Sequence, residues 1–391
     1  MGPTVASRHY VDRADCDVDE LVRLVATVTP PGSYRHASGS EGEIVVYDIA
    51  AFDDARDDAR ARRELMAELV TVLRDGPGGF VVTRAVDRGV LDRVTVAFER
   101  MITEQRAAGM AAGDHFAKAG ANDRLWNALE KLALAEPGLF VDYYATPVLA
   151  LAATAWLGPA YQVTSQLNVV NPGGVAQSPH RDYHLGFMSA DQAACYPMHV
   201  HAMSALLTLQ GAIAHCDMPV ETGPTKLLPH SQKYPSGYVA WGRPDVMELF
   251  EARCVQPPLA AGDALFFNPA LLHAAGSNRT NDVRRMANLL QVSSAFGRAM
   301  ETVDRTRTTL AVYAALRERL ARGTHVHELE AVIAACSEGY AFPTNLDRDP
   351  PLGGMAPACQ ADVVRGALTD GWDGERLERA LVALDERRRT S

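Results

Sequence analysis

Apolar positions in the first third of the chain recur mainly at helical spacing. Asp54–Leu73 is a charged segment in which Leu65, Leu69 and Leu73 fall on one face, and this predicts an amphipathic helix. Glycines in Gly76–Gly79 interrupt the pattern, and Phe80–Val82 then predicts a short strand. Three further segments are predicted to be helical: Val90–Ala108, Asn122–Leu134 and the apolar run Pro147–Ala160.

The pattern changes between Gln162 and about Phe296, where short apolar runs are separated by Pro and Gly. Gln166–Val169 alternates polar and apolar residues, as a strand does when one of its faces borders a polar cavity. Asn171–Gly174 is a strong turn signal. Three more strands are predicted, at Ala205–Leu209, Ala264–Phe267 and Ala287–Val292. Many short strands with turns between them indicate a barrel or a sandwich.

Helical spacing returns after Glu301. The predicted helices are Leu310–Leu320, His327–Ala335 and Glu375–Arg387, with a loop rich in Pro, Gly and Asp at Phe342–Ala356. We therefore divide the chain into an N-terminal segment (1–52), a main domain (53–300, with its β core at about 162–296) and a C-terminal helical extension (301–391).

Composition narrows the class of protein. The formal net charge is −10 over 391 residues, and no dense run of Lys and Arg precedes the C-terminal tail, so we expect no nucleic-acid partner. The N-terminus is polar, so we expect no signal peptide, and the longest apolar run is shorter than the ~20 residues that a membrane helix needs. The six cysteines form no C-x-x-C pair, which argues against a structural zinc site and a disulfide framework. We expect a cytoplasmic protein without a membrane partner.

One motif carries metal chemistry. His180 and Asp182 are two residues apart, so in a strand both side chains point to the same side. His273, from a distant strand, would complete a triad of two histidines and one carboxylate. This triad leaves coordination positions open and suits non-haem iron(II).

Other interpretations of the motif fit less well. His180-Arg181-Asp182 matches the catalytic loop of protein kinases, but no glycine-rich loop precedes it and Phe187 stands where the kinase Asn should fall. No H-E-x-x-H motif indicates a zinc hydrolase. His199 and His201 have cupin spacing, but the expected Glu is missing.

An anion anchor follows the second histidine. Arg284 and Arg285 precede the predicted strand over Met286–Val292, and a guanidinium can hold a carboxylate through two parallel hydrogen bonds. Because side chains alternate along a strand, only one of the two arginines is expected to act as the anchor. The alternative is that both are ordinary surface charges.

Three segments together resemble the phytanoyl-CoA dioxygenase-like branch of the iron(II)/2-oxoglutarate-dependent oxygenases. They are Gln166–Asp182, Glu221–Lys233 and Gly262–Arg284, and the resemblance covers about 76–296. It implies a mainly β protein with a double-stranded β-helix core (a jelly roll, cupin-like), N-terminal helices packed outside, and a C-terminal helical extension.

The resemblance also implies roles for individual residues. It places Fe(II) on His180, Asp182 and His273, and the distal carboxylate of 2-oxoglutarate on Arg284, with O2 as the second co-substrate. Gln166 and Asn168 fall where the family contacts the co-substrate. Related halogenases have a small residue in place of Asp182, so halogenation is disfavoured.

We therefore predict an iron(II)- and 2-oxoglutarate-dependent dioxygenase that hydroxylates a C–H bond of a small metabolite or natural-product intermediate, releasing succinate and CO2. Desaturation, cyclisation and epimerisation stay open, as does a homodimer. The rival interpretations are a 2-oxoglutarate-independent cupin-type dioxygenase and a non-catalytic metal- or ligand-binding protein. Four histidines of the β region suggest a polar pocket: His184, His199, His201 and His215. His230 has no assigned role either, and is a loop residue or a pocket residue.

Overall fold

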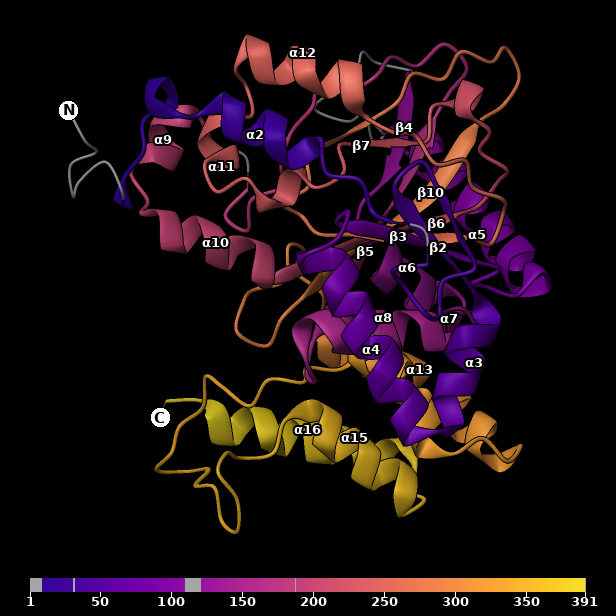
Figure 1. The fold of residues 1–391 in the computed structure, drawn as a ribbon. Helices are drawn as coiled ribbons and strands as arrows, with labels where there is room; N and C mark the ends of the chain where they lie inside the picture. The colour runs from indigo at the N-terminus through magenta and orange to yellow at the C-terminus, as the bar shows by residue number, and fades with distance from the viewer. Residues whose placement is uncertain (1–8, 31, 110–120, 187, 391) are drawn as a thin grey trace.

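The computed structural model describes residues 9–30, 32–109, 121–186 and 188–390 (Figure 1). Its centre is an eight-stranded sheet with strand order β1-β2-β3-β8-β6-β10-β5-β4, accompanied by a two-stranded sheet of β7 and β9. β2 and β3 run parallel, and the other pairs in the large sheet are antiparallel. The strands are β1 Gly39–Glu41, β2 Ile44–Asp48, β3 Gly79–Thr83, β4 Asn122–Leu125, β5 Gln162–Val170, β6 Thr208–Ala214, β7 Thr225–Leu227, β8 Ala264–Phe267, β9 His273–Ala275 and β10 Arg285–Ser293.

The two faces of the large sheet have different neighbours. On β10, Met286, Leu290 and Val292 belong to the main apolar core, which also contains the helices packed against that face. Residues of the alternate set, such as Ala287 and Leu289, line a cavity on the opposite face. This is the two-residue alternation of a strand between an apolar core and a polar site.

Helices supply most of the covering layer. Several begin at an Asp whose side chain accepts hydrogen bonds from the first free backbone amides, as Asp58 does for Arg60 and Ala61 at 2.7 and 3.1 Å. The helices up to β10 are α2 Val18–Val25, α3 Ile49–Asp57, α4 Ala59–Arg74, α5 Arg88–Ala107, α6 Ala128–Ala135, α7 Pro137–Tyr144, α8 Pro147–Leu157, α9 Ala190–Ala194, α10 Met198–Leu206, α11 Gly237–Ala240 and α12 Pro244–Arg253. Short 3-10 helices lie at Arg13–Asp15, Val220–Thr222, Ser231–Lys233 and Val326–Leu329.

The small sheet is extended by two single bridges, which pair His180 with His273 and Val255 with Leu227. It contributes Thr225, His273 and Ala275 to the lining of the same cavity that the large sheet borders. The cavity therefore lies between the two sheets.

The C-terminal extension consists of α13 Arg305–Ala321, α14 Glu330–Cys336, α15 Gln360–Thr369 and α16 Gly374–Arg388. Buried Arg305 ties its first helices to the large sheet, donating to the carbonyl oxygens of Ala335 at 2.7 Å and Val163 at 2.9 Å. In Figure 1, α15 and α16 form the yellow layer at the bottom, at the far end of the molecule from the strands.

The structure corrects three expectations. The protein is not mainly β, because 46% of it is helical. Asn122–Leu134 is not one helix: β4 occupies its first four residues, where pairing with β5 outweighs a sequence with low strand propensity. Ala205–Leu209 is the end of α10 followed by the start of β6, an ambiguity typical of short apolar runs.

Most other predicted elements are confirmed with small shifts of their ends. β3, α5, β5, β8 and β10 lie where the pattern placed them, and α13, α14 and α16 match the three predicted C-terminal helices. The helix predicted over Asp54–Leu73 is broken at extended Asp58, so its first residues end α3 and the rest form α4. α8 is the buried helix predicted from the longest apolar run, and it ends at Gly158, which has a φ of +75°. The predicted N-terminal segment contributes β1 and β2 to the large sheet.

Within the described part of the chain, no single helix has the length and apolar composition of a membrane span; α7 and α8 satisfy both together, but they are bent by 61° at the break between them.

Candidate metal centre and its cavities

Backbone pairing brings the two predicted histidine ligands together. The amide of His180 donates to the carbonyl of His273 at 2.9 Å, and the reverse hydrogen bond is 3.0 Å long. Their ring centroids are 4.5 Å apart. Asp182 lies two residues beyond His180, and one ligand atom from each of the three side chains lies within 4.8 Å of the others. The structure thus brings together the three residues predicted to bind the metal.

Hydrogen bonds to the backbone orient both imidazoles. Nδ1 of His180 lies 2.9 Å from the carbonyl oxygen of Ser178, and Nδ1 of His273 lies 2.9 Å from that of Leu271. With a proton on each Nδ1, Nε2 carries the lone pair that can bind a metal, and these Nε2 atoms lie 3.7 and 3.8 Å from the carboxylate oxygens of Asp182. Burial, together with the nearby His180, lowers the pKa of His273 to about 4, which keeps this imidazole in its neutral, metal-binding form.

The carboxylate has a partner that the sequence did not reveal. Gln210, on β6, donates a hydrogen bond from its side-chain amide to Asp182 Oδ2. Such a contact fixes the orientation of a ligating carboxylate. Thr208, Gln210 and Ala212 alternate along β6 with the core residues Leu209 and Ile213, and this alternation was hidden because the predicted strand stopped at Leu209.

The metal centre opens into a cavity of about 180 Å³ between the sheets, which we call the inner cavity. It is lined by the three predicted ligands and by residues from five strands of the large sheet. Gln166 and Asn168 lie in its wall, as predicted for co-substrate contacts. Gln166 accepts a hydrogen bond from Arg124 at 3.2 Å, and the side-chain oxygen of buried Asn168 has no partner among the described residues.

The expectation that Arg284 faces the co-substrate site is wrong in register by one residue. The side chain of Arg284 is 40% exposed and lies 3.5 Å from Glu99 and 3.7 Å from Asp123, outside the cavity. Arg285 is 6% exposed and lines the inner cavity. The physical reason is strand alternation: β10 begins at Arg285, which pairs with Val170 and shares a face with Ala287, Leu289 and Gln291.

Arg285 is a buried cation without a counter-ion among the described residues. Its one hydrogen bond within the described residues is a long one, 3.5 Å, to the carbonyl of Gly276, and no carboxylate there pairs with it. Burial lowers its pKa to about 10, so the guanidinium is still charged at neutral pH. A buried charge without a counter-ion is costly, and an anion in the cavity would remove that cost.

The remaining histidines do not form one polar pocket. His215 lies on the helical side of the sheet between Thr95 and Tyr143, at 2.8 and 2.9 Å, and burial lowers its pKa to about 3. His230 is buried with Nδ1 at 2.9 Å from the ammonium of Lys233, and burial lowers its pKa to about 4.

His199 is exposed, and His201 is buried within a cluster of tyrosines. Only His184, of the five histidines left without a role, borders a cavity next to the metal centre.

That cavity, which we call the outer cavity, has a volume of about 290 Å³. It shares Asp182, Gln210, Gln291 and Met300 with the inner cavity, so these four residues form a common wall. The metal centre therefore borders two cavities, of which only the inner one contains Arg285.

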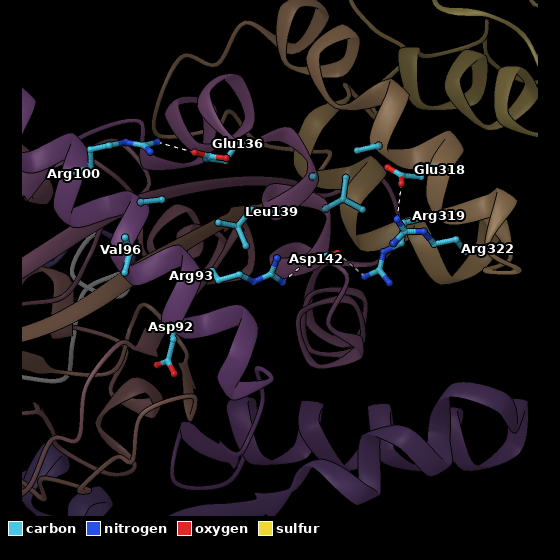
Figure 2. Close-up of a pocket in the computed structure, with 14 residues that line it drawn as sticks. Asp92, Arg93, Val96, Arg100, Glu136, Leu139, Asp142, Glu318, Arg319 and Arg322 are labelled. Atoms are coloured by element: carbon cyan, nitrogen blue, oxygen red, sulfur yellow. Dashed lines mark hydrogen bonds and ion pairs between the residues drawn. The ribbon is translucent and has the colours of Figure 1, made fainter.

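A larger cavity, of about 670 Å³, lies elsewhere, among α5, α7 and α13 (Figure 2). Figure 2 shows Arg93 and Arg319 directed at Asp142, and Arg100 directed at Glu136. Because these arginines are paired with carboxylates of the chain itself, a bound anion would have to displace a partner that is already there. The chemistry therefore points to the two cavities at the metal centre.

Comparison with known proteins gives one family. A family model described as phytanoyl-CoA dioxygenase matches residues 75–286. No curated protein matches the chain.

Several solved structures are similar. The non-heme alpha ketoglutarate dependent epimerase SnoN from nogalamycin biosynthesis is 20% identical, with 61% of this chain and 85% of SnoN covered and a TM-score of 0.40. A structure of SnoN in complex with Fe3+, alpha ketoglutarate and nogalamycin RO gives the same values. AviO1 from Streptomyces viridochromogenes Tue57 is 18% identical, with 59% and 95% covered and a TM-score of 0.43. Similarity at this level says nothing about the substrate of this chain.

Proposed function

Because the chain belongs to the phytanoyl-CoA dioxygenase family, we propose that it is an iron(II)- and 2-oxoglutarate-dependent oxygenase with its active site in the inner cavity. His180, Asp182 and His273 would hold the iron. The family assignment and the grouping of the three ligand atoms within 4.8 Å support this.

The observation that carries the proposal is the placement of Arg285. A 2-oxo acid that chelates a metal through one end needs its far carboxylate held, and a guanidinium does this with two parallel hydrogen bonds. Arg285 is buried, charged and without a carboxylate partner in the described structure, and it lines the same cavity as the triad. A dicarboxylate bound to the metal at one end and to Arg285 at the other would fill open coordination positions of the metal and give Arg285 a carboxylate partner.

When bound, iron with 2-oxoglutarate and O2 supplies oxidative decarboxylation to succinate and CO2 and the oxidation of a substrate C–H bond. The protein supplies position and exclusion of water. The carbonyls of Ser178 and Leu271 hold the imidazoles, and Gln210 holds the carboxylate. Apolar groups shield the centre, including Phe267, whose ring centroid lies 4.8 Å from that of His273.

Hydroxylation is the outcome we propose, on a small metabolite or natural-product intermediate. We further propose that Gln166 and Asn168 contact the co-substrate, since both lie in the wall of the inner cavity. We also propose that the chain consists of an N-terminal segment (1–52), a main domain (53–300) and a C-terminal extension (301–391).

The test is succinate formation. Purified protein is given Fe(II), 2-oxoglutarate and O2, and succinate is quantified against an anaerobic control. We expect O2-dependent succinate from the unmodified protein and only background from the Asp182→Ala protein. A protein that binds iron and releases no succinate would be a metal-binding protein or a dioxygenase that does not use 2-oxoglutarate.

A further inference from the structure

The outer cavity has a polar interior. Ser204 accepts a hydrogen bond from the amide of His184 at 2.8 Å, and His184 Nδ1 lies 3.2 Å from the hydroxyl of Thr208. The other ring nitrogen, Nε2, accepts from the amide of Arg298 at 3.2 Å. Both nitrogens of His184 are therefore in use, and the imidazole forms part of the wall instead of offering a free group.

Two buried polar atoms in the lining of this cavity are left without partners among the described residues. They are the side-chain oxygen of Gln210 and the hydroxyl of Tyr183. Gln210 is 5% exposed and Tyr183 is 7% exposed. An unsatisfied buried polar atom costs about 1–3 kcal/mol, so each such atom in a native structure points to a missing partner. Here the missing partner would be a group that donates to Gln210 and exchanges a hydrogen bond with Tyr183.

Three exposed residues form the rim of the cavity. Leu185 and Met300 are apolar and are 58% and 50% exposed, and the third is the cation Arg298. Phe296 is 88% exposed, on the segment that joins β10 to the C-terminal extension.

Two contacts hold that segment over the cavity. The amide of Ser294 donates to the carbonyl of Leu207 at 2.9 Å. A Cβ on Gly297 would lie 2.9 Å from the His184 ring, so the backbone passes directly against the cavity wall. Leu185 and Met300 thus bring exposed apolar side chains into the lining of a polar cavity, as is typical of a ligand-binding site.

We propose that the outer cavity binds the primary substrate, and that this substrate is an uncharged amphiphile. Its hydroxyl or amide end would meet Gln210 and Tyr183, and its apolar body would lie across Leu185, Phe296 and Met300. The buried polar groups of the lining are hydroxyls and amides, and the carboxylate of Asp182 in the shared wall disfavours an anionic end beside them; the one arginine of the lining, Arg298, is exposed at the rim. This inference rests on the proposed function, because it names the substrate class of the same metal centre.

Primary alcohols of increasing length are suitable probes. We would titrate 1-butanol, 1-hexanol and 1-octanol into the protein by calorimetry, without oxygen, with Fe(II) and 2-oxoglutarate present and again without them. Each methylene that becomes buried should strengthen binding by up to about fourfold. Octanoate, with the same chain and a charged end, should bind at least about tenfold more weakly than 1-octanol.

Exposed positions provide variants that keep the fold. Leu185→Asn and Phe296→Ser should each weaken 1-octanol binding by about fivefold or more and affect 1-butanol less. Leu352→Asn is the matched control, since Leu352 is 89% exposed in the C-terminal extension and lies outside both cavities. Affinity that is independent of chain length, octanoate binding as tightly as 1-octanol, or rim variants that behave like Leu352→Asn would each overturn the proposal.

The same titrations separate this inference from the proposed function. Arg285→Ala should lose 2-oxoglutarate binding and keep 1-octanol binding. If the unmodified protein binds the alcohols as described and does not bind 2-oxoglutarate, the proposed function is wrong and the outer cavity remains a binding site for amphiphiles. If it binds 2-oxoglutarate and not the alcohols, the substrate class is wrong and the proposed function stands.

Discussion

Replacing Arg285 with Ala should weaken 2-oxoglutarate binding steeply. Arg285 is 6% exposed, and no carboxylate in the described structure lies against its guanidinium. Losing one member of a buried, charge-assisted pair costs on the order of 2–5 kcal/mol, because the other charge stays buried without a partner. This corresponds to roughly 30-fold to several-thousand-fold weaker binding.

The assay is an anaerobic calorimetric titration of 2-oxoglutarate into the Fe(II)-loaded protein. Iron binding should be nearly unchanged in the variant, since Arg285 is not among the three grouped ligands. Arg285→Lys should recover only part of the affinity, because an ammonium retains the charge but not the two-donor fork.

Arg284→Ala is the matched control one residue away. Arg284 is 40% exposed, and its ion pairs at 3.5 and 3.7 Å are worth about 0–1 kcal/mol of stability at most. Its removal should leave 2-oxoglutarate affinity within about twofold. A large loss in Arg284→Ala with none in Arg285→Ala would refute the register that the structure gives β10.

Three further predictions concern the site and the sheet. Asp182→Ala, and likewise His273→Ala, should lose iron binding in a metal titration while circular dichroism shows a folded protein. Gln210→Leu should weaken iron binding about 10- to 100-fold by releasing the carboxylate of Asp182, whereas Gln291→Leu, opposite it on β10, should not. Burial lowers the pKa of His215 to about 3, so its imidazole takes up a proton more readily in the unfolded chain than in the folded one. The free energy of unfolding should therefore fall as the pH drops below about 6.5. Between pH 7 and 5.5 urea unfolding should show a loss of about 1 kcal/mol from this residue, which His215→Gln removes; an equal loss in the variant would contradict it.

The metal triad could be predicted because its signal is local. Two residues spaced as His180 and Asp182 are point to the same side wherever the backbone is extended. The backbone pairing of His180 with His273 keeps this segment extended. His273, which the sequence analysis proposed as the third member, lies beside the other two in the structure.

The choice between Arg284 and Arg285 depends on which residues of β10 face the cavity and which face the core. The sequence leaves this open. Both faces of this strand carry a mixture of apolar and polar residues, with Asn288 on the core side and Gln291 on the cavity side. The resemblance to the family pointed to Arg284, whereas pairing with Val170 turns Arg285 toward the inner cavity.

The helical content and the outer cavity could not be predicted for a related reason. β4 and the end of α10 acquire their structure from pairing and packing with residues far along the chain. The outer cavity is assembled from residues between Asp182 and Gln210 and from the end of β10 and the segment after it, so its lining spans more than a hundred residues of sequence.

The most direct test of the central claim is a crystal structure of the protein grown without oxygen in Fe(II) and 2-oxoglutarate. The account predicts a metal bound by His180, Asp182 and His273 and a dicarboxylate in the inner cavity whose far carboxylate meets Arg285. A metal held by other residues, or a 2-oxoglutarate whose far carboxylate lies on Arg284 or outside the inner cavity, would contradict it.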